Sequence, residues 1–232
     1  MKIEIKNRYN GLVIFSHDCE NNTIEITVEA ALVSRADLSY ANFSGADFSG
    51  ADFTDADFTD ADFSGADLSY ANFSGADLSY ADFSGADLSY ANFSGADFTD
   101  ADLSYANFTR ANFTGANFTR ADFSGADLSY ADFTGANFRE ANFRGVKIKG
   151  GIKLLSARPI ITISCMGSRD SFLTAFNTEN GIFISTERYT QIGLKDFIDM
   201  VEEEHEGGIY QTQYLNALNF IESNFKIIGK NK

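Results

Sequence analysis

The sequence has little of what disulfide-rich, membrane-spanning or secreted proteins need. Its 232 residues contain two cysteines, Cys19 and Cys165, which are too few and too isolated for a disulfide framework. We interpret them as free thiols in a reducing compartment and expect a cytoplasmic protein. No apolar run approaches the ~18 residues of a membrane span. Met1 to Lys6 also lacks the apolar core of a secretory signal.

Histidine is equally scarce, and catalytic motifs are missing. His17-Asp18-Cys19 has the residue types of a nucleophilic site, but three successive strand residues cannot face one substrate. Gly167-Ser168-Arg169 lacks the Walker spacing and the lysine of a phosphate loop. Residues 202–206 combine His205 with four glutamates, which we interpret as a solvated helix end. Negative side chains at the carboxyl end of a helix interact unfavourably with the helix dipole. Their presence therefore favours the existence of a binding partner. We predict no enzyme activity, no cofactor and no metal site.

Basic residues are scarcer than acidic ones. The chain has 18 Lys and Arg against 33 Asp and Glu, for a net charge of −15. It has no basic patch, so we expect neither direct nucleic-acid binding nor membrane binding. Any partner would be a protein.

What the sequence does contain is a period of five residues from Ala36 to Gly145. Each of twenty-two units reads Ala, Asp or Asn, Phe or Leu, a short polar residue and one variable residue. Five matches neither the helix period nor the strand period. Within a unit, Ala and Phe or Leu alternate with Asp or Asn as in a very short strand, and the last two residues must turn the chain. The pattern therefore predicts a parallel solenoid.

This repeat resembles the pentapeptide repeat family. The resemblance implies a mainly β fold, a right-handed quadrilateral parallel β-helix in which four units make one square coil. Twenty-two units would then make five and a half coils. Ala and the central Phe or Leu would face the interior, so positions twenty residues apart would stack. The predicted core columns are Leu38, Phe58, Leu78, Phe98, Phe118 and Phe138, and Phe43, Phe63, Phe83, Leu103, Phe123 and Phe143. Ser or Thr hydroxyls would bond backbone groups at the corners.

The same register stacks second-position carboxylates about 4.8 Å apart. One column holds Asp37, Asp57, Asp77 and Asp97, and the next holds Asp62, Asp82, Asp102 and Asp122. Some members of the family are DNA mimics that bind type II topoisomerases, and these columns would be the corresponding acidic interaction face. The present array departs from those members, since it has no loop insertions and precedes a whole domain. In the other interpretation, Asp and Asn are simply the family's usual solvent-facing residues.

The variable fifth residues are not random. Glycine dominates two corner columns, whereas tyrosine and charged residues gather on the two diagonally opposite ones. This register places Arg110 between Tyr90 and Tyr130, and Arg120 between Asp100 and Glu140. Such exposed pairs contribute about 0–1 kcal/mol each.

We divide the chain into an amino-terminal cap at 1–35, the array at 36–145 and a small carboxyl-terminal α+β domain at 146–232. In the cap, Asn10-Gly11 between two apolar runs predicts a β-hairpin. Thr27 is predicted to begin a short helix as its N-cap.

The carboxyl-terminal segment alternates predicted strands and helices. Apolar runs indicate strands at 160–165 and 182–186, with a third at 172–176. Helical spacing indicates helices at 194–205 and 210–225. We expect these elements to form a domain that covers the carboxyl end of the solenoid.

The predicted function is that of a non-enzymatic structural or interaction solenoid. Within the array, Leu occurs only in the block Asp-Leu-Ser-Tyr, six times over. Such regularity is typical of a designed consensus scaffold on natural-like caps. The alternative is an acidic DNA mimic that binds a type II topoisomerase such as DNA gyrase. A protein partner would bind the acidic faces or the carboxyl-terminal domain.

Overall fold

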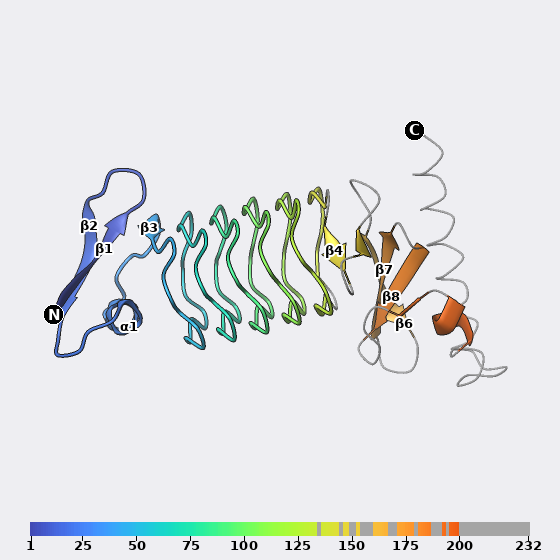
Figure 1. The fold of residues 1–232 in the computed structure, drawn as a ribbon, viewed down its shortest axis with the longest axis horizontal. Helices are drawn as coiled ribbons and strands as arrows, with labels where there is room; N and C mark the ends of the chain where they lie inside the picture. The colour runs from blue at the N-terminus through green and yellow to red at the C-terminus, as the bar shows by residue number, and fades with distance from the viewer. Residues whose placement is uncertain are drawn as a thin grey trace.

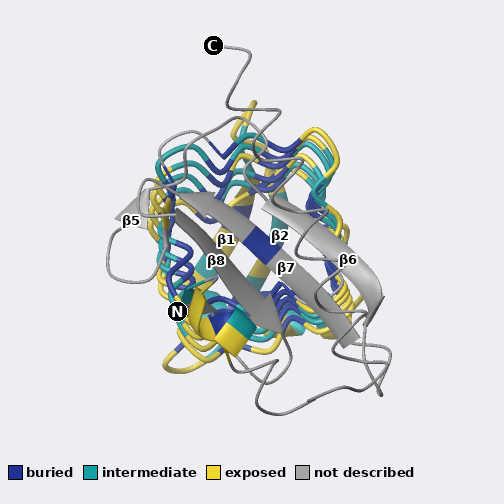
Figure 2. Ribbon diagram, turned by 90° about the vertical axis from the view of Figure 1, so that its right-hand side faces the viewer, coloured by how far each residue is buried: buried dark blue, intermediate teal, exposed yellow. Residues whose placement is uncertain are grey.

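The array is a rod of stacked coils (Figure 1). Viewed along the rod, successive coils superimpose on a four-sided outline (Figure 2). The computed structural model describes residues 1–133, 136–143, 146–148, 152–153, 160–166, 171–178, 181–186, 192–193 and 195–199.

From Asn42 to Asp127, each second-position residue pairs in parallel with the residue twenty positions later. These bridges run without interruption from Asn42↔Asp62 to Asp127↔Lys147. Four five-residue units therefore complete one coil, as the family resemblance implies. The fold is therefore a parallel β-helix with four sides.

The corners require an unusual backbone conformation. In the unit that contains Phe83, the Ala86 N–H donates to the Phe83 carbonyl at 3.0 Å, and the Gly85 N–H reaches the next coil at Ser104 O, 2.9 Å. The fifth residue of every described unit has φ between +55° and +75°. This left-handed conformation at the third residue of a four-residue turn bends the path once per unit. Because the bend repeats, every central side chain points to the same axis.

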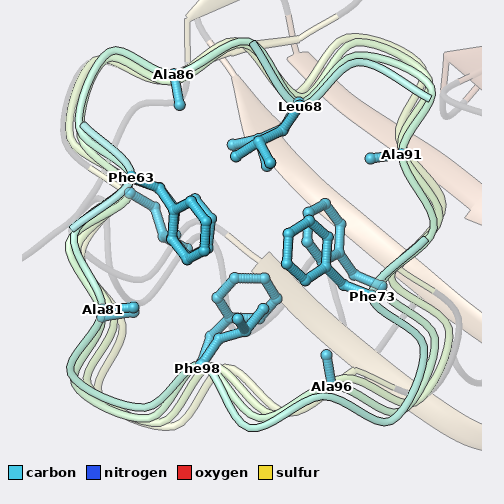
Figure 3. Close-up of a cluster of buried hydrophobic side chains, with 14 of the residues drawn as sticks. Phe63, Leu68, Phe73, Ala81, Ala86, Ala91, Ala96 and Phe98 are labelled. Atoms are coloured by element: carbon cyan, nitrogen blue, oxygen red, sulfur yellow. The ribbon is translucent and has the colours of Figure 1, made fainter. Parts of the chain in front are cut away.

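The core consists of these central side chains and the alanines. Figure 3 shows Phe63, Leu68, Phe73 and Phe98, which come from two successive coils, pointing inward from the four sides of the rod, with Ala81, Ala86, Ala91 and Ala96 between them. Along a column, rings stack: Phe63 and Phe83 lie 5.0 Å apart with their planes 7° apart. Between columns the rings meet edge to face, an arrangement that aromatic pairs also favour. Eleven of the twelve residues of the two predicted core columns are buried, and Phe138 is half-buried against the same core.

The amino-terminal segment joins the first coil through a sheet. Strands β1 (Lys2–Asn7) and β2 (Val13–Asp18) form an antiparallel hairpin, and β1 also pairs with β3 (Ala41–Asn42). Helix α1 (Ile24–Val33) adds Val28 and Ala31 to the core cluster that runs through the array. The hairpin thus covers the backbone edge on one face of the first coil.

The predicted helix start at Thr27 is wrong. The N-cap of α1 is Thr23, whose hydroxyl oxygen accepts the Ile26 N–H at 3.2 Å. Thr27 is buried inside the helix, and its hydroxyl donates to the carbonyl four residues earlier, Thr23 O, at 2.9 Å. Both threonines fit a cap by residue type, but Ile24 and Ile26 extend the helix one turn earlier.

At the carboxyl end the coil pairing continues past the last repeat, since the Lys147 N–H donates to Ala126 O at 2.9 Å. Strands β4 and β5 then form a two-stranded sheet, and β6 to β9 form a four-stranded antiparallel sheet in sequence order. Residues 195–199 are helical, with Phe197 buried. These strands are β4 (Lys147–Ile148), β5 (Ile152–Lys153), β6 (Ile160–Met166), β7 (Ser171–Thr178), β8 (Gly181–Thr186) and β9 (Ile192–Gly193).

The three strands expected from apolar runs coincide with β6, β7 and β8. The helix expected at 210–225 lies outside the described residues, as does the end of the helix expected at 194–205. The three-part division of the chain stays a prediction.

Candidate interaction surface

Most of the predicted acidic residues form two rows along the rod. Parallel bridges join Asp57, Asp77 and Asp97 in one row, and Asp62, Asp82, Asp102 and Asp122 in the next. All seven side chains are exposed or half-exposed. Asp37 is also exposed, but no bridge joins it to Asp57 within the described part of the chain.

The second-position side chain closes the corner of its own unit. In every described unit from Asp37 to Asp127, and at Asn137, its Oδ1 accepts the backbone N–H two residues later at 2.8–3.2 Å. This is an Asx-turn, which Asp and Asn both form. One oxygen of each carboxylate therefore has a structural role.

The expected role of the Ser and Thr hydroxyls needs correction. Where their bonds are described, they donate to the same Oδ1 and not to the backbone, as Ser64 Oγ does to Asp62 at 2.6 Å. Paired donors of this kind stabilise an ionised carboxylate. They lower the pKa of Asp37, through the Ser39 hydroxyl and then its N–H, and the pKa of Asp52, mainly through the Thr54 hydroxyl. The Ser49 N–H and hydroxyl lower the pKa of Asp47.

Asparagine forms the same turn and adds a bond along the rod. Asn72, Asn92 and Asn112 each donate an Nδ2–H to the Oδ1 of the residue twenty positions earlier, at 3.0–3.2 Å. Two neighbouring aspartates have no such donor and repel each other. The fold accordingly accepts Asp but does not require its charge.

The net negative charge of the array lies in one part of it. Residues 36–109 contain fourteen Asp and no Lys or Arg, whereas residues 110–145 contain three Asp, one Glu and four Arg. In the described structure, cations reach the acidic part from its two ends. Arg8 pairs with Asp82 at 3.4 Å, and the Arg120 guanidinium forms two hydrogen bonds to the Asp100 carboxylate, which lowers the pKa of Asp100.

Sequence reasoning missed Arg8. It lies in the β1–β2 connection, and its Nη1 donates to the carbonyls of Asp60 and Ala61, both at 3.1 Å. The nearby Tyr9 hydroxyl reaches Asp60 Oδ1 at 3.3 Å. A residue outside the periodic part of the chain thus fixes the hairpin to the array and neutralises one member of the second acidic row.

One corner carries a ladder of planar groups, which we call the Tyr70 ladder: Tyr70, Tyr90, Arg110 and Tyr130. The rings of Tyr70 and Tyr90 stack with centroids 4.9 Å apart and planes 10° apart. The Arg110 Cζ lies 5.7 Å from the Tyr90 ring centroid and 5.6 Å from that of Tyr130. The guanidinium is therefore sandwiched between two aromatic rings.

The candidate chemical groups do not converge. His17 is half-buried, and Asp18 is exposed and pairs with the amino terminus at 3.1 Å. Cys19 is half-buried and free. Within the described residues no group of His, Cys, Asp and Glu could hold a metal ion, and no helix is long and apolar enough to cross a membrane. His205 and the glutamates around it lie outside the described residues, and the side chain of Cys165 is likewise not described.

A hollow of about 340 Å³ opens where α1 meets the first coil. The first unit, which contains Asp37, makes no described bridge to the coil beneath it. The hollow is lined by Leu32, Arg35, Ala36, Asp37, Leu38, Asp55, Ala56 and Asp57.

Comparison with known proteins adds a family and several similar structures. The family described as pentapeptide repeats matches in eight copies over residues 34–69, 66–104 and 106–145. No curated protein matches the chain.

Three solved structures illustrate the similarity. A pentapeptide repeat protein from the Arabidopsis thaliana thylakoid lumen is 38% identical over 43% of this chain and 69% of its own, with a TM-score of 0.41. The pentapeptide repeat protein Rfr23 from the cyanobacterium Cyanothece 51142 is 28% identical over 45% of this chain and 61% of its own, with a TM-score of 0.26. The plasmid-mediated fluoroquinolone resistance protein QnrB1, in a trypsin-treated form, is 31% identical over 47% of this chain and 78% of its own, with a TM-score of 0.20.

Proposed function

This chain belongs to the pentapeptide repeat family, and on that premise we propose that it is a non-enzymatic structural and interaction solenoid, designed as a consensus scaffold. The observation that carries the proposal is that the repeating side chains are used by the fold. Ala and Phe or Leu fill the interior, and the second-position oxygen closes each corner. The fifth residues and the outer carboxylate oxygens are left to face a partner.

The blocks of sequence support a designed origin. Tyrosine occurs in the array only after Leu-Ser, although Leu and Phe occupy equivalent core positions. Leu68 and Phe73, in adjacent units, are both fully buried. Packing therefore gives no reason for Leu to be tied to Tyr, whereas assembly from a small set of designed blocks does.

The ends of the chain complete the proposal. Residues 1–35 would cap the first coil through β1 and α1, and residues 146–232 would be an α+β domain that caps the other end. Because repeat arrays expose core and strand edges at their ends, both segments would keep the rod from associating end to end. The free thiol of Cys19 supports a reducing, cytoplasmic setting.

A second candidate function is favoured by the acidic part of the array. Asn would close each corner equally well and add a bond to the preceding coil, so the eleven second-position Asp of residues 36–109 exceed what the fold needs. Successive carboxylates within a row would lie about 4.8 Å apart, and such a row of negative charge would suit a basic groove that normally holds DNA. Under this alternative the chain is a DNA mimic that binds a type II topoisomerase such as DNA gyrase.

A supercoiling assay with DNA gyrase separates the two functions. A pure scaffold should not inhibit the enzyme at any salt concentration, and this is the result we expect. A DNA mimic should inhibit at low salt, and the triple variant Asp57→Asn, Asp77→Asn, Asp97→Asn should inhibit much less.

The control for this assay is Asp127→Asn. Asp127 is bridged by Asn107 and Lys147, so the control removes a charge outside the two acidic rows. Inhibition by the wild type and the control, lost in the triple variant, would replace the scaffold proposal with the DNA-mimic proposal.

A further inference from the structure

The Tyr70 ladder is built at a cost in backbone energy. Tyr70, Tyr90, Arg110 and Tyr130 all have φ near +62°, a region in which side chains other than glycine cost about 1–2 kcal/mol per residue. Glycine fills most positions of the two neighbouring corner columns, where φ is also positive. The ladder is therefore a surface feature that the turn itself does not need.

Corner side chains lean over the next coil toward the carboxyl end. A Cβ placed on Gly125 would lie 2.7 Å from the ring of Tyr105, and one on Gly75 would collide with the Asp55 carboxylate. Asp55 and Tyr105 thus each cover the corner residue twenty positions later. In the ladder, Tyr70 covers Tyr90 in the same way.

The ladder has a bare end at Gly50. Gly50 has no side chain to place over the ring of Tyr70, and apart from Gly50 and its two chain neighbours no atom lies within 4 Å of the point where a Cβ of Gly50 would be. The exposed fraction of Tyr70 is 65%, compared with 46% for Tyr90 inside the stack. One face of the Tyr70 ring is therefore open at the position that a further planar group would occupy.

The surroundings of this face select a cation. Asp47 and Asp67 bridge each other beside the corner, and Asp52 follows Gly50 by two residues. None of the three is in an ion pair of the described residues. Within the ladder a guanidinium already stacks in this way, since that of Arg110 lies between the rings of Tyr90 and Tyr130.

We propose that the open face of Tyr70, above Gly50, binds an arginine side chain of a protein partner. A guanidinium is planar and positive, stacks on aromatic rings and pairs with carboxylates, so it would continue the ladder by one step. A lysine ammonium lacks the planar face, and a nucleic acid would bring phosphates against the aspartates. The site rests on the proposed interaction role of the rod, but it gives that role a specific chemistry.

The test compares two labelled peptides, hexa-arginine and hexa-lysine, by fluorescence anisotropy at about 0.1 M salt. Wild type and Tyr70→Phe, which keeps the ring, should bind hexa-arginine about two- to fivefold more tightly than Tyr70→Leu does. The affinity for hexa-lysine should be the same in all three proteins.

A matched pair of glycine variants tests the position. Gly50→Arg would place the chain's own guanidinium over Tyr70 and should abolish the preference for hexa-arginine over hexa-lysine. Gly95→Arg adds the same charge at a similar backbone conformation, φ +69° against +75°, but between glycines of another corner, and should keep the preference.

The outcomes separate the site from the wider role of the rod. If the wild type binds both peptides and no variant changes the ratio, the acidic rod is an interaction surface but this site is wrong. If neither peptide binds, both ideas fall. If light scattering shows a wild-type dimer that Gly50→Arg dissolves, a second copy of this chain occupies the site and the proposed partner is wrong.

Discussion

Residues 36–109 and residues 110–145 have the same backbone and core but different surfaces. In both parts the coils pair every twenty residues, the corners close through an Asx-turn, and rings stack along the columns. The first part nevertheless carries fourteen Asp without a Lys or Arg, whereas the second balances its charges. Interior and turn positions fix the fold, and the charge of the surface varies independently of it.

Equal core mutations test whether the two parts are alike inside. Phe83 and Phe123 are both fully buried, one in each part. Phe83→Ala and Phe123→Ala should each lower the free energy of unfolding by about 3–5 kcal/mol, because stacked coils cannot easily collapse into the void. Urea unfolding measures both. A loss below about 1 kcal/mol in only one variant would show that the two cores differ.

Arg8 makes the acidic part depend on the amino-terminal hairpin. Its side chain is only 15% exposed and bonds two carbonyls as well as Asp82. Arg8→Ala should cost about 1.5–3 kcal/mol, as expected for hydrogen bonds from a charged group. Arg139, whose side chain is 75% exposed beside Glu140, is the control in the balanced part. Arg139→Ala should cost about 0–1 kcal/mol. Equal losses of stability in the thermal unfolding of the two variants would show that Arg8 does not hold the hairpin to the array.

Removing charge should stabilise the acidic part and leave the balanced part unchanged. Replacing Asp57, Asp77 and Asp97 by Asn should raise the free energy of unfolding by about 1–2 kcal/mol at low salt, since each close pair repels by about 1 kcal/mol before screening. The gain should shrink at high salt. Asp127→Asn should bring no gain, because Asn107 and Lys147 are the bridged neighbours of Asp127. A gain in both variants would mean that amide hydrogen bonds, and not charge, are responsible.

Low pH should destabilise the first coil, and this is the smallest of the expected effects. Hydrogen bonds hold the pKa values of Asp37, Asp47 and Asp52 below their ordinary value in the folded state. The stabilisation they provide is therefore complete above the ordinary aspartate pKa of about 4, and it is lost as the pH falls through the lower folded values. Melting temperatures from pH 7 to pH 2 should show this loss. The variant with all three replaced by Asn should lose less, because an amide oxygen accepts at every pH; equal losses would contradict this account.

The sequence predicts the periodic part well because one local geometry repeats. The five-residue unit and the family resemblance together place Phe63 on Phe83 and bridge Asp62 to Asp82, as in the structure. The Asx-turn was also readable, since Asp followed by Ser two residues later favours it. The role of the hydroxyls was assigned to the wrong acceptor because the carboxylate competes with the backbone at the same corner.

The non-periodic part was harder to predict. Arg8 contacts residues that follow it by 52 to 74 positions, and no spacing in the sequence indicates such a contact. Thr23 and Thr27 are equally good caps by type, and only the packing of α1 decides between them. Whether the acidic rows and the Tyr70 ladder bind anything depends on a partner, whose chemistry the sequence does not contain.

The direction of the inter-coil hydrogen bonds has a mechanical consequence. Each coil is held to the next by bonds that run along the rod, such as Phe83 N to Asp102 O at 2.7 Å. A force that pulls the two ends apart along the rod loads the bonds of one coil boundary at a time, as in a zipper. Each released coil of twenty residues would lengthen the chain by about 61–67 Å, given about 3.3–3.6 Å per extended residue and about 4.8 Å of rod lost. Under tension the rod would extend in equal steps, one coil at a time.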